Sequence, residues 1–231
     1  MLFGLHAVEA ALANPKRQVL RVLVTENSAH RLSPLLARRG LTPEQVSPRD
    51  LDRLLGGEAV HQGVALEAEP LAPVGLDEVD AHGILLVLDQ VTDPQNVGAA
   101  LRSAAAFGAS GLVMTERHSP PLQGVLAKAA SGALDIVPVI LVKNLAQCLA
   151  LLGERGVLRV GLAEEADKTL ETAQLQRPLA LVLGAEGRGL RQLTQEHCDL
   201  IRRISTQSAL ASLNVSNAAA VALHWASLNA R

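Results

Sequence analysis

The chain has 231 residues, of which 48% are hydrophobic and 19% are charged. That length accommodates one large domain or two smaller ones, each with its own buried core. No apolar run approaches the roughly 20 residues that cross a bilayer. The N-terminal segment has no basic region and already carries Glu9, so it does not resemble a signal peptide. We therefore expect a cytoplasmic protein with no membrane segment.

The charge and aromatic content limit how the chain can bind nucleic acid. The formal net charge is −2, and the chain has two phenylalanines, one tryptophan and no tyrosine. This composition argues against the aromatic base-stacking platforms of many RNA-binding domains. RNA binding would depend on local basic patches instead. Candidate patches are Lys16-Arg17 with Arg21, Arg38-Arg39, and Arg188 with Arg191 and Arg202-Arg203.

Cysteine and histidine give no sign of a metal site. Cys148 and Cys198 are too far apart in sequence for paired metal ligands and too few for a disulfide framework. The seven histidines are scattered, and neither His197 nor His224 lies in a recognisable catalytic triad. We expect two reduced thiols and no bound metal.

The first 69 residues predict a small α/β domain. Its expected elements are helices over 4–13, 30–39 and 48–54 and strands over 19–24 and 63–69. Two prolines and a glycine within residues 70–75 then predict a linker, which we place at 70–80.

Residues 81–231 predict a second and larger domain. Short apolar runs without polar alternation are expected to be strands, at 84–88, 112–115, 136–140, 158–162, 179–183 and 200–204. Expected helices lie between them, at 96–107, 123–131, 144–152 and 188–196, with a last helix after Ser212. This pattern is typical of a parallel sheet with helices on both faces. Ligands bind at the carboxyl ends of such strands, so this domain should carry the chemistry.

The segment after the first of these strands contains a conspicuous arginine. The strand is expected to end at Asp89, with a turn at Pro94 and a helix from Asn96. Arg102 lies on that helix, which has almost no other charge and an apolar face of Val97, Leu101, Ala104 and Ala105. The functional interpretation is a substrate-binding arginine. The structural alternative is an ion-paired or snorkelling Arg102 with Asn96 as a helix cap.

Two further polar segments occur near the C-terminus. The loop Gly184-Ala-Glu-Gly-Arg-Gly189 follows an apolar strand and has neither Walker nor dinucleotide-fingerprint spacing. Glu186 within it is expected either to face a cation or to cap the next helix. Ser212 is the expected N-cap of the final helix. Asn214 has no evident role in helix stability.

In this order and spacing, three segments resemble the signature motifs of the SpoU/TrmH family of SPOUT RNA 2′-O-ribose methyltransferases. They are Asp93-Pro-x-Asn96-x-Gly98-x3-Arg102, Leu183-Gly-x-Glu-Gly-x-Gly189 and Ser212-Leu-Asn-Val-Ser216. Shorter segments resemble the ribosomal RNA guanosine branch of that family and its small substrate-binding domain. These are Gly4-Leu-His-Ala-Val-Glu9, His61-Gln-Gly63, Ala130-Ser-Gly-Ala133 and Glu196-His-Cys-Asp199.

The resemblance implies a parallel sheet with a C-terminal trefoil knot, S-adenosyl-L-methionine as cofactor, and a homodimer packed through the methyltransferase domains. It implies a guanosine of 23S ribosomal RNA as the target. The cofactor would lie against Gly184, Ile204 and Leu213. The positions that match the family's catalytic and structural polar residues are Asn96, Arg102, Glu186, Ser212 and Asn214. Trp225 on the last helix would belong either to the dimer interface or to the core.

A mechanism follows as a hypothesis. A guanidinium group stays protonated in proteins, so Arg102 is a poor general base. We expect Arg102 to stabilise the developing alkoxide of the target ribose while the proton leaves to a phosphate oxygen or water. Asn96 would hold the adjacent chain, and Glu186 would orient Arg102 or Asn214.

The sequence also fits three other functions. After Ile204 the family usually has a proline, a methionine and then a glycine, whereas this chain has Ser205-Thr-Gln-Ser208. That difference supports a non-catalytic RNA-binding or assembly factor that has lost its cofactor. The same motifs also fit a methyltransferase of tRNA, and the glycine loop alone fits a generic nucleotide-dependent α/β enzyme.

Overall fold

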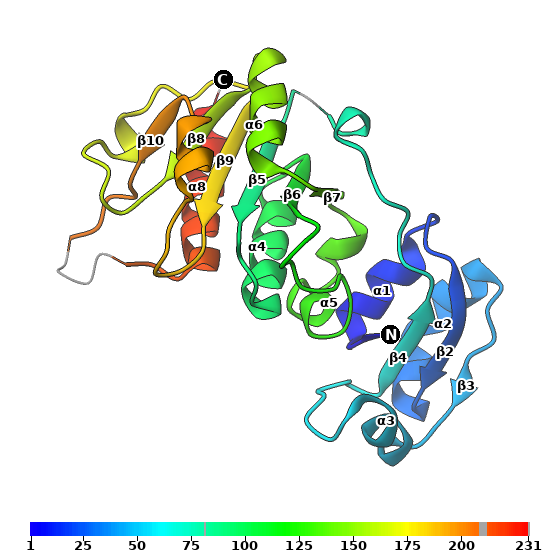
Figure 1. Cartoon of the computed structure of the whole chain (residues 1–231). Helices are drawn as coiled ribbons and strands as arrows, with labels where there is room; N and C mark the ends of the chain where they lie inside the picture. Colours follow the sequence, from blue (N-terminus) through cyan, green and yellow to red (C-terminus); the bar gives the residue numbers. More distant parts are fainter. Residues whose placement is uncertain (81, 208–211, 231) are drawn as a thin grey trace.

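The computed structural model describes residues 1–80, 82–207 and 212–230, arranged around two β-sheets (Figure 1). Residue 81 and Arg231, the expected ends of the second domain, lie outside the described residues, as does Ser208. None of the described helices is long and apolar enough to span a membrane.

The N-terminal sheet has four strands in the order β1-β4-β2-β3. Strands β4 and β2 pair antiparallel in its centre. The elements of this part are β1 (Leu2–Phe3), α1 (Leu5–Ala13), β2 (Val19–Val24), α2 (Glu26–Arg39), β3 (Glu44–Gln45), α3 (Pro48–Leu55) and β4 (Val64–Ala68). The two-residue strands β1 and β3 are not predicted from sequence, because they are too short to have a hydrophobic period.

The second sheet has six strands in the order β10-β8-β9-β5-β6-β7, and every pair is parallel. The prediction of a parallel sheet is therefore confirmed. Its strands are β5 (Ile84–Asp89), β6 (Gly111–Thr115), β7 (Val139–Val142), β8 (Leu158–Leu162), β9 (Leu179–Gly184) and β10 (Leu200–Arg202). The helices are α4 (Pro94–Ala106), α5 (Val125–Ala129), α6 (Leu145–Glu154), α7 (Gln192–Glu196) and α8 (Val215–Asn229), with 3-10 turns at Leu76–Glu78, Ala133–Asp135 and Leu170–Thr172.

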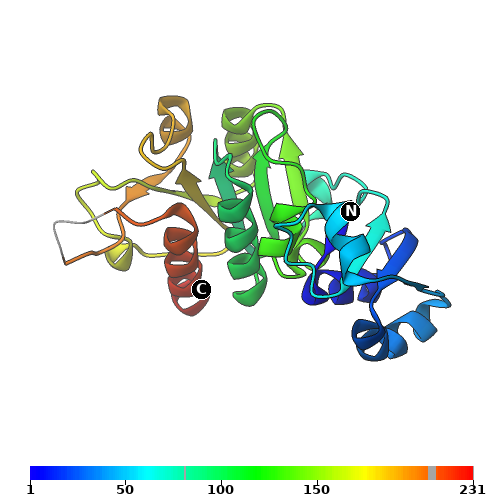
Figure 2. The same cartoon turned by 90° about the horizontal axis from the view of Figure 1, so that it is seen from below.

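Both faces of the second sheet are covered by helices. In β5, Leu86 belongs to the core beneath α4 and α8, while Leu85 and Val87 belong to the core beneath α6. Figure 2 shows α4 and α8 on one side of the strands and α6 and α7 on the other. All six residues of β5 are buried, which explains why its sequence has no polar alternation.

Several element boundaries differ from the predictions for physical reasons. Helix α4 begins at Pro94, which needs no N–H partner at the first helical position, and Asp93 caps it by accepting from the Gln95 N–H at 3.0 Å. The alternative that Asn96 is the helix cap is therefore wrong. The strand predicted over 136–140 begins instead at Val139, and Ile136 is 68% exposed.

The two sheets are connected by a contact that we call the seam, formed by α1 with residues 130–135. Gly132 has a φ of 95°, and a Cβ there would lie 2.7 Å from Ala10 Cβ and 3.0 Å from the His6 carbonyl oxygen. Only glycine allows both this conformation and this approach. The segment Ala130-Ser-Gly-Ala133 is thus explained by packing between the two parts of the chain.

A buried ion pair lies beside this contact. Arg17 Nε donates to Asp135 Oδ1 at 2.9 Å and its second arm donates to Oδ2 at 3.1 Å, while Asn14 donates to Oδ1 at 2.9 Å. The side chains of Arg17 and Asp135 are only 4% and 3% exposed. The expectation that Arg17 belongs to a basic surface patch is therefore wrong. Arg21 is similarly paired, with Glu67 at 2.7 Å.

Removal of the arginine from this buried pair should destabilise the protein strongly. Arg17→Met leaves the Asp135 charge buried with only Asn14 as a side-chain partner, which should lower the free energy of unfolding by about 3–5 kcal/mol. Urea denaturation followed by circular dichroism measures this. The control is Arg21→Met, because both partners of the Arg21–Glu67 pair are 42% exposed and such pairs contribute at most about 1 kcal/mol. Equal losses in the two variants would contradict a buried seam.

Candidate active site

The glycine loop closes tightly on the end of β9. Strands β5 and β9 end side by side, with Asp89 opposite Gly184. A Cβ on Gly184 would lie 2.1 Å from the carbonyl carbon of Gly189, and the Gly189 N–H donates to Ala185 O at 2.8 Å. The loop therefore folds back against the strand that precedes it. Gly184 is required by this closure, whatever ligand the loop binds.

A buried carboxylate anchors the far end of the loop. Asp89 is fully buried and accepts from the Arg191 N–H at 3.0 Å and from Arg191 Nε at 2.7 Å. Arg191 is thus engaged with a buried charge, which argues against its assignment to an RNA-binding patch. The loop between β9 and α7 is fixed at both ends.

The three sequence motifs meet in one hydrogen-bonded group, which we call the Asn–Glu cluster (Asn96, Glu186 and Asn214). Glu186 Oε1 accepts from Asn214 Nδ2 at 2.7 Å, from Asn96 Nδ2 at 3.2 Å and from the Val215 N–H at 3.3 Å. Asn214 Nδ2 also donates to Asn96 Oδ1 at 2.9 Å. Residues more than a hundred positions apart in sequence are thereby joined.

Asn214 is the N-cap of α8. Its Oδ1 accepts from the Ser216 N–H at 2.9 Å and from the Asn217 N–H at 3.4 Å. The prediction of Ser212 as the N-cap is wrong, because the helix begins two residues later than that position would allow. Glu186 does cap a helix, but through Val215 of α8 rather than through α7. Of the two partners proposed for Glu186, its hydrogen bond is to Asn214.

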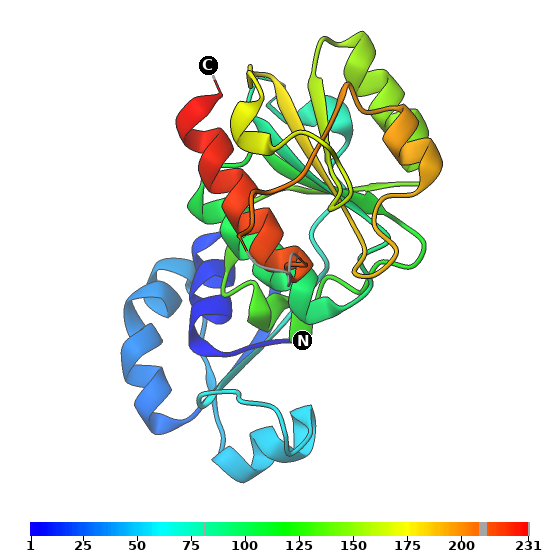
Figure 3. The ribbon, with the colours of Figure 1, turned by 90° about the vertical axis from the view of Figure 1, so that its left-hand side faces the viewer.

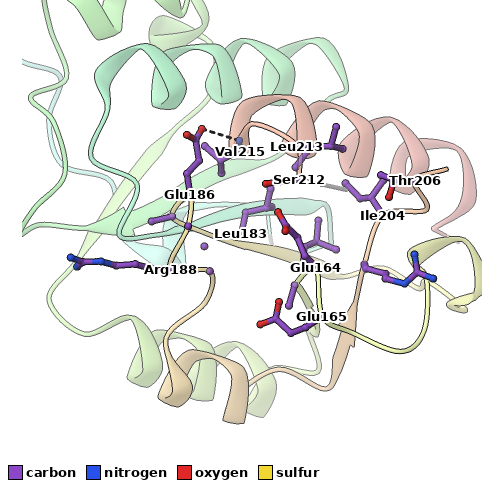
Figure 4. A pocket seen from close by; sticks show the side chains of 18 residues that line it. Glu164, Glu165, Leu183, Glu186, Arg188, Ile204, Thr206, Ser212, Leu213 and Val215 are labelled. Carbon is purple, nitrogen blue, oxygen red and sulfur yellow. Dashed lines mark hydrogen bonds between the residues drawn. The ribbon is translucent and has the colours of Figure 1, made fainter. Parts of the chain in front are cut away.

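A cavity of about 220 Å³ lies next to the glycine loop (Figure 4). Apolar walls come from Leu183, Leu213 and Val215, and the carboxylates of Glu164 and Glu165 come from the segment after β8. Of the predicted residues, the cavity lining includes Gly184, Glu186, Ile204, Ser212 and Leu213. Thr206, from the Ser205-Thr-Gln-Ser208 segment noted above, also lines the cavity, whereas Glu164 and Glu165 are not among the predicted site residues. The two glutamates follow directly after a parallel strand, which was the available signal.

The residues around this cavity fit S-adenosylmethionine. This group combines a flat heterocycle, sugar hydroxyls and a positively charged sulfonium. Apolar side chains suit the heterocycle, and exposed carboxylates suit hydroxyl groups and positive charge. Gly187 and Gly189 have φ values of 73° and 63°, and a Cβ at either would meet open space, so bare backbone borders the cavity.

A much larger open space of about 1340 Å³, which we call the groove, lies on the other side of the Asn–Glu cluster. Asn96, Arg102 and Asn214 line it from the second sheet, and Gly4, His6 and Gln62 line it from the N-terminal part. Figure 3 shows the start of α8 at the end of the second sheet that is nearer to the N-terminal elements. Arg102 is exposed, so its guanidinium is available to a bound molecule.

The Asn–Glu cluster therefore separates two spaces. Glu186 lines the small cavity, while Asn96 and Asn214, which bond to it, line the groove. The hydrogen bonds of Glu186 to Asn96 and Asn214 thus join a residue that lines one space to residues that line the other. Such an arrangement suits transfer of a small group between two bound molecules.

The remaining polar candidates have structural explanations. Burial raises the pKa of the Cys148 thiol to about 11 and that of Cys198 to about 12, so neither is a nucleophile at neutral pH. Asp199 binds Arg159 of β8 through both oxygens, and this hydrogen bonding lowers the pKa of the Asp199 carboxyl. The described residues contain no cluster of three or more groups suited to a metal ion.

Comparison with known proteins identifies the class to which this fold and site belong. Residues 83–224 match the SpoU rRNA Methylase family, and residues 1–74 match the family described as RNA 2′-O ribose methyltransferase substrate binding. The chain belongs to the SpoU rRNA Methylase family.

Individual relatives share almost the whole chain. It is 39% identical to the 23S rRNA (guanosine-2′-O-)-methyltransferase RlmB of Pseudomonas aeruginosa, over 96% of this chain and 93% of that protein. It is 41% identical to the RlmB of Yersinia pestis, over 96% and 94%. The crystal structure of the SpoU methyltransferase AviRb from Streptomyces viridochromogenes with AdoMet has a TM-score of 0.82 and 23% identity, over 100% of this chain and 91% of that one. That likeness establishes the shared fold.

The Asn–Glu cluster can be tested through stability. Glu186→Ala removes the acceptor for Val215 at the start of α8 and for two amides, which should lower the unfolding free energy by about 1–2 kcal/mol. The midpoint temperature of thermal unfolding, Tm, should fall by roughly 2–8 °C. Glu186→Gln keeps an acceptor oxygen, so its loss of unfolding free energy should be less than half that of Glu186→Ala. Glu165→Ala removes an exposed carboxylate from the same cavity, and a shift as large as that of Glu186→Ala would contradict the inferred role.

Proposed function

We propose that this protein transfers a methyl group from S-adenosylmethionine to a ribose 2′-hydroxyl of RNA, and that the target is a guanosine of 23S ribosomal RNA. The observation that carries the proposal is the Asn–Glu cluster, which joins a cavity whose lining suits the cofactor to a large open groove. The RlmB relatives support the choice of RNA, because their similarity extends over nearly the whole chain. Such a reaction would take place in the cytoplasm.

The two parts of the chain would divide the work. In this proposal residues 1–69 bind RNA, residues 70–80 link the parts, and residues 81–231 carry the reaction. The proposal also includes a trefoil knot near the C-terminus. The knot is supported by the parallel bridge between Thr169 and Arg203. Through this bridge the segment after β10 lies beside the segment that follows β8.

The chemistry assigns distinct tasks to the side chains. When bound, S-adenosylmethionine supplies an electrophilic methyl group. Gly184, Ile204 and Leu213 hold the cofactor, and Ser212 borders the same cavity. Arg102 binds the target ribose and its phosphate, and stabilises the negative charge that develops on the 2′-oxygen as its proton leaves to a phosphate oxygen or water. The Asn–Glu cluster keeps Asn96 and Asn214 in fixed positions beside the reacting hydroxyl.

The proposal includes a homodimer that packs through the second domain. Helix α8 supports this, because Val221 and Leu228 on it are 43% and 70% exposed. Trp225 on the same helix is half-buried, and its indole Nε1 is buried without a hydrogen-bond partner among the described residues. An exposed apolar face of this kind is typical of an oligomer interface.

The first experiment is methyl transfer from radiolabelled S-adenosylmethionine to unmethylated 23S ribosomal RNA and to bulk tRNA, followed by nucleoside analysis. We expect label in 2′-O-methylguanosine from the ribosomal RNA alone. Label only in tRNA would keep the reaction and overturn the substrate. No label in either RNA would favour a non-catalytic factor and direct attention to Ser205 and Thr206, of which Thr206 borders the cofactor cavity.

Substitution of Arg102 tests the assigned chemistry. Arg102→Ala should lower kcat by about 100- to 1000-fold, as loss of one charge-stabilising donor does in other enzymes. Binding of S-adenosylmethionine, measured by calorimetry, should be unchanged because Arg102 lines the groove and not the cofactor cavity. Arg102→Lys keeps the positive charge but loses the planar guanidinium, which can donate two parallel hydrogen bonds, so it should recover little activity. Near-normal turnover of Arg102→Ala would overturn the role.

A further inference from the structure

The groove is larger than a typical site for a small ligand. Its volume of about 1340 Å³ exceeds the roughly 300–1,000 Å³ of sites for small molecules. Both parts of the chain line it, and the seam with its buried Arg17–Asp135 pair holds these parts against each other. The groove is therefore a preformed binding surface with two walls.

The charge of the groove is positive, unlike that of the whole chain. Arg102 lines one wall, and Lys128 of α5 lies where the two walls meet. Glu58 is the only carboxylate among its described lining residues, and it is exposed. A groove of this charge attracts a phosphate backbone even though the protein carries a net charge of −2.

Lys128 connects the two parts of the chain. Its ammonium group lies 5.9 Å from the centre of the Phe3 ring, so a cation of the second part rests on an aromatic ring of the first. The side chain is half-buried, which restricts the position of the charge. A lysine held in this way loses less side-chain entropy when it binds a phosphate than a freely moving one.

The segments at 4–9 and 61–63 form the wall opposite Arg102. Gln62 has a positive φ of 54° and its Oε1 accepts from the Leu5 N–H at 3.0 Å, which joins the two segments. A Cβ on Gly4 would lie 3.3 Å from that oxygen and 3.9 Å from Lys128 Cγ, so the backbone here is close to Lys128. These contacts explain why both segments belong to one surface.

Apolar and amide groups accompany the cations. Val60 and Val125 line the groove and are 61% and 49% exposed, which leaves aliphatic surface for unstacked bases. Side-chain amides also line it at Gln62, Gln95 and Asn217, where the Gln62 NH₂ group and the amides of Gln95 and Asn217 offer donors and acceptors to base edges. Sequence-specific recognition of RNA uses such groups on single-stranded loops, whose bases are accessible.

We propose that the groove binds a single-stranded segment of the substrate RNA, with Lys128 as a phosphate-binding residue that positions the strand between the N-terminal wall and Arg102. The proposal rests on the proposed function for the identity of the RNA. Lys128 is a positioning residue here, since it lies in the groove and outside the Asn–Glu cluster. The basic patches expected from sequence are not required, and Arg17, Arg21 and Arg191 are engaged in ion pairs instead.

The test compares Lys128→Gln with Lys143→Gln, an equal loss of charge at an exposed residue that lines neither the cavity nor the groove. The probe is a fluorescent RNA hairpin with the 23S target loop, titrated by anisotropy at several salt concentrations. Lys128→Gln should weaken binding about 3- to 10-fold and reduce the salt slope by about 0.7, the value for one single-strand phosphate contact. Lys128→Arg should restore both. Equal effects of the two glutamine variants would overturn the proposal.

A second pair of variants avoids the Lys128–Phe3 contact. Val60→Glu places a negative charge on the exposed groove wall and should weaken hairpin binding at least 5-fold. Leu20→Glu makes the same change at a residue of β2 that is 52% exposed and outside the groove, and it should have little effect. A fully paired duplex of the same sequence should bind more weakly than the hairpin. Equal binding of duplex and hairpin would overturn the single-strand assignment.

Methyl transfer distinguishes this proposal from the proposed function. In the methyl-transfer assay, Lys128→Gln should raise the KM for RNA more than it lowers kcat. Val60→Glu should have the same effect. If wild-type protein transfers no methyl group but the groove variants still weaken RNA binding, the proposed function fails and the groove assignment stands. If transfer is normal in wild type and unaffected in KM by either variant, the groove assignment fails alone.

Discussion

The Glu186 carboxylate is the interaction on which the rest of the site depends. One of its oxygens accepts from Asn96, Asn214 and the first N–H of α8, so α4, the glycine loop and the last helix converge on a single group. The two bonds from asparagine amides are exposed, the bond from the Val215 N–H is partly buried, and each is individually modest. Their effect is positional, because they fix the layer between the small cavity and the groove. A carboxylate can do this since it has acceptor sites and no donor that would compete.

The seam performs the corresponding task at the scale of the whole chain. Gly132 permits α1 to approach, and the Arg17–Asp135 pair closes the contact with a bidentate interaction between buried charges. Burial of two charges is costly unless the geometry is good, so such a pair favours one arrangement over many. The groove exists because the two parts are held in that arrangement. The Asn–Glu cluster and the contact between the two parts of the chain are thus both organised by a carboxylate that accepts from several donors.

Much of this architecture is predictable from sequence because the relevant signals are local. Unbroken apolar runs predict the parallel strands, and the glycine loop indicates a site at the end of β9. Three residues selected from separate motifs, Asn96, Glu186 and Asn214, are in contact in the structure. Helix caps are less predictable. Ser212 and Asn214 are both good capping residues, and only the start of α8 decides between them. The burial and ion pairing of Arg17 could not be predicted, because its partner Asp135 lies more than a hundred residues away in sequence.

The closeness of packing at Gly132 has a consequence for how this protein can change. The residues that receive the N-terminal part, Gly132 and Asp135, belong to the same short segment that follows α5, and α5 lines the groove. An N-terminal part taken from a relative therefore has to fit the surface of residues 130–135 before it can complete the groove. A graft from a relative would need an arginine for Asp135 and a small residue facing Gly132, or the groove would open. Residues 130–135 follow the linker in sequence but pack against the N-terminal part in space, so the two parts are expected to change together during evolution.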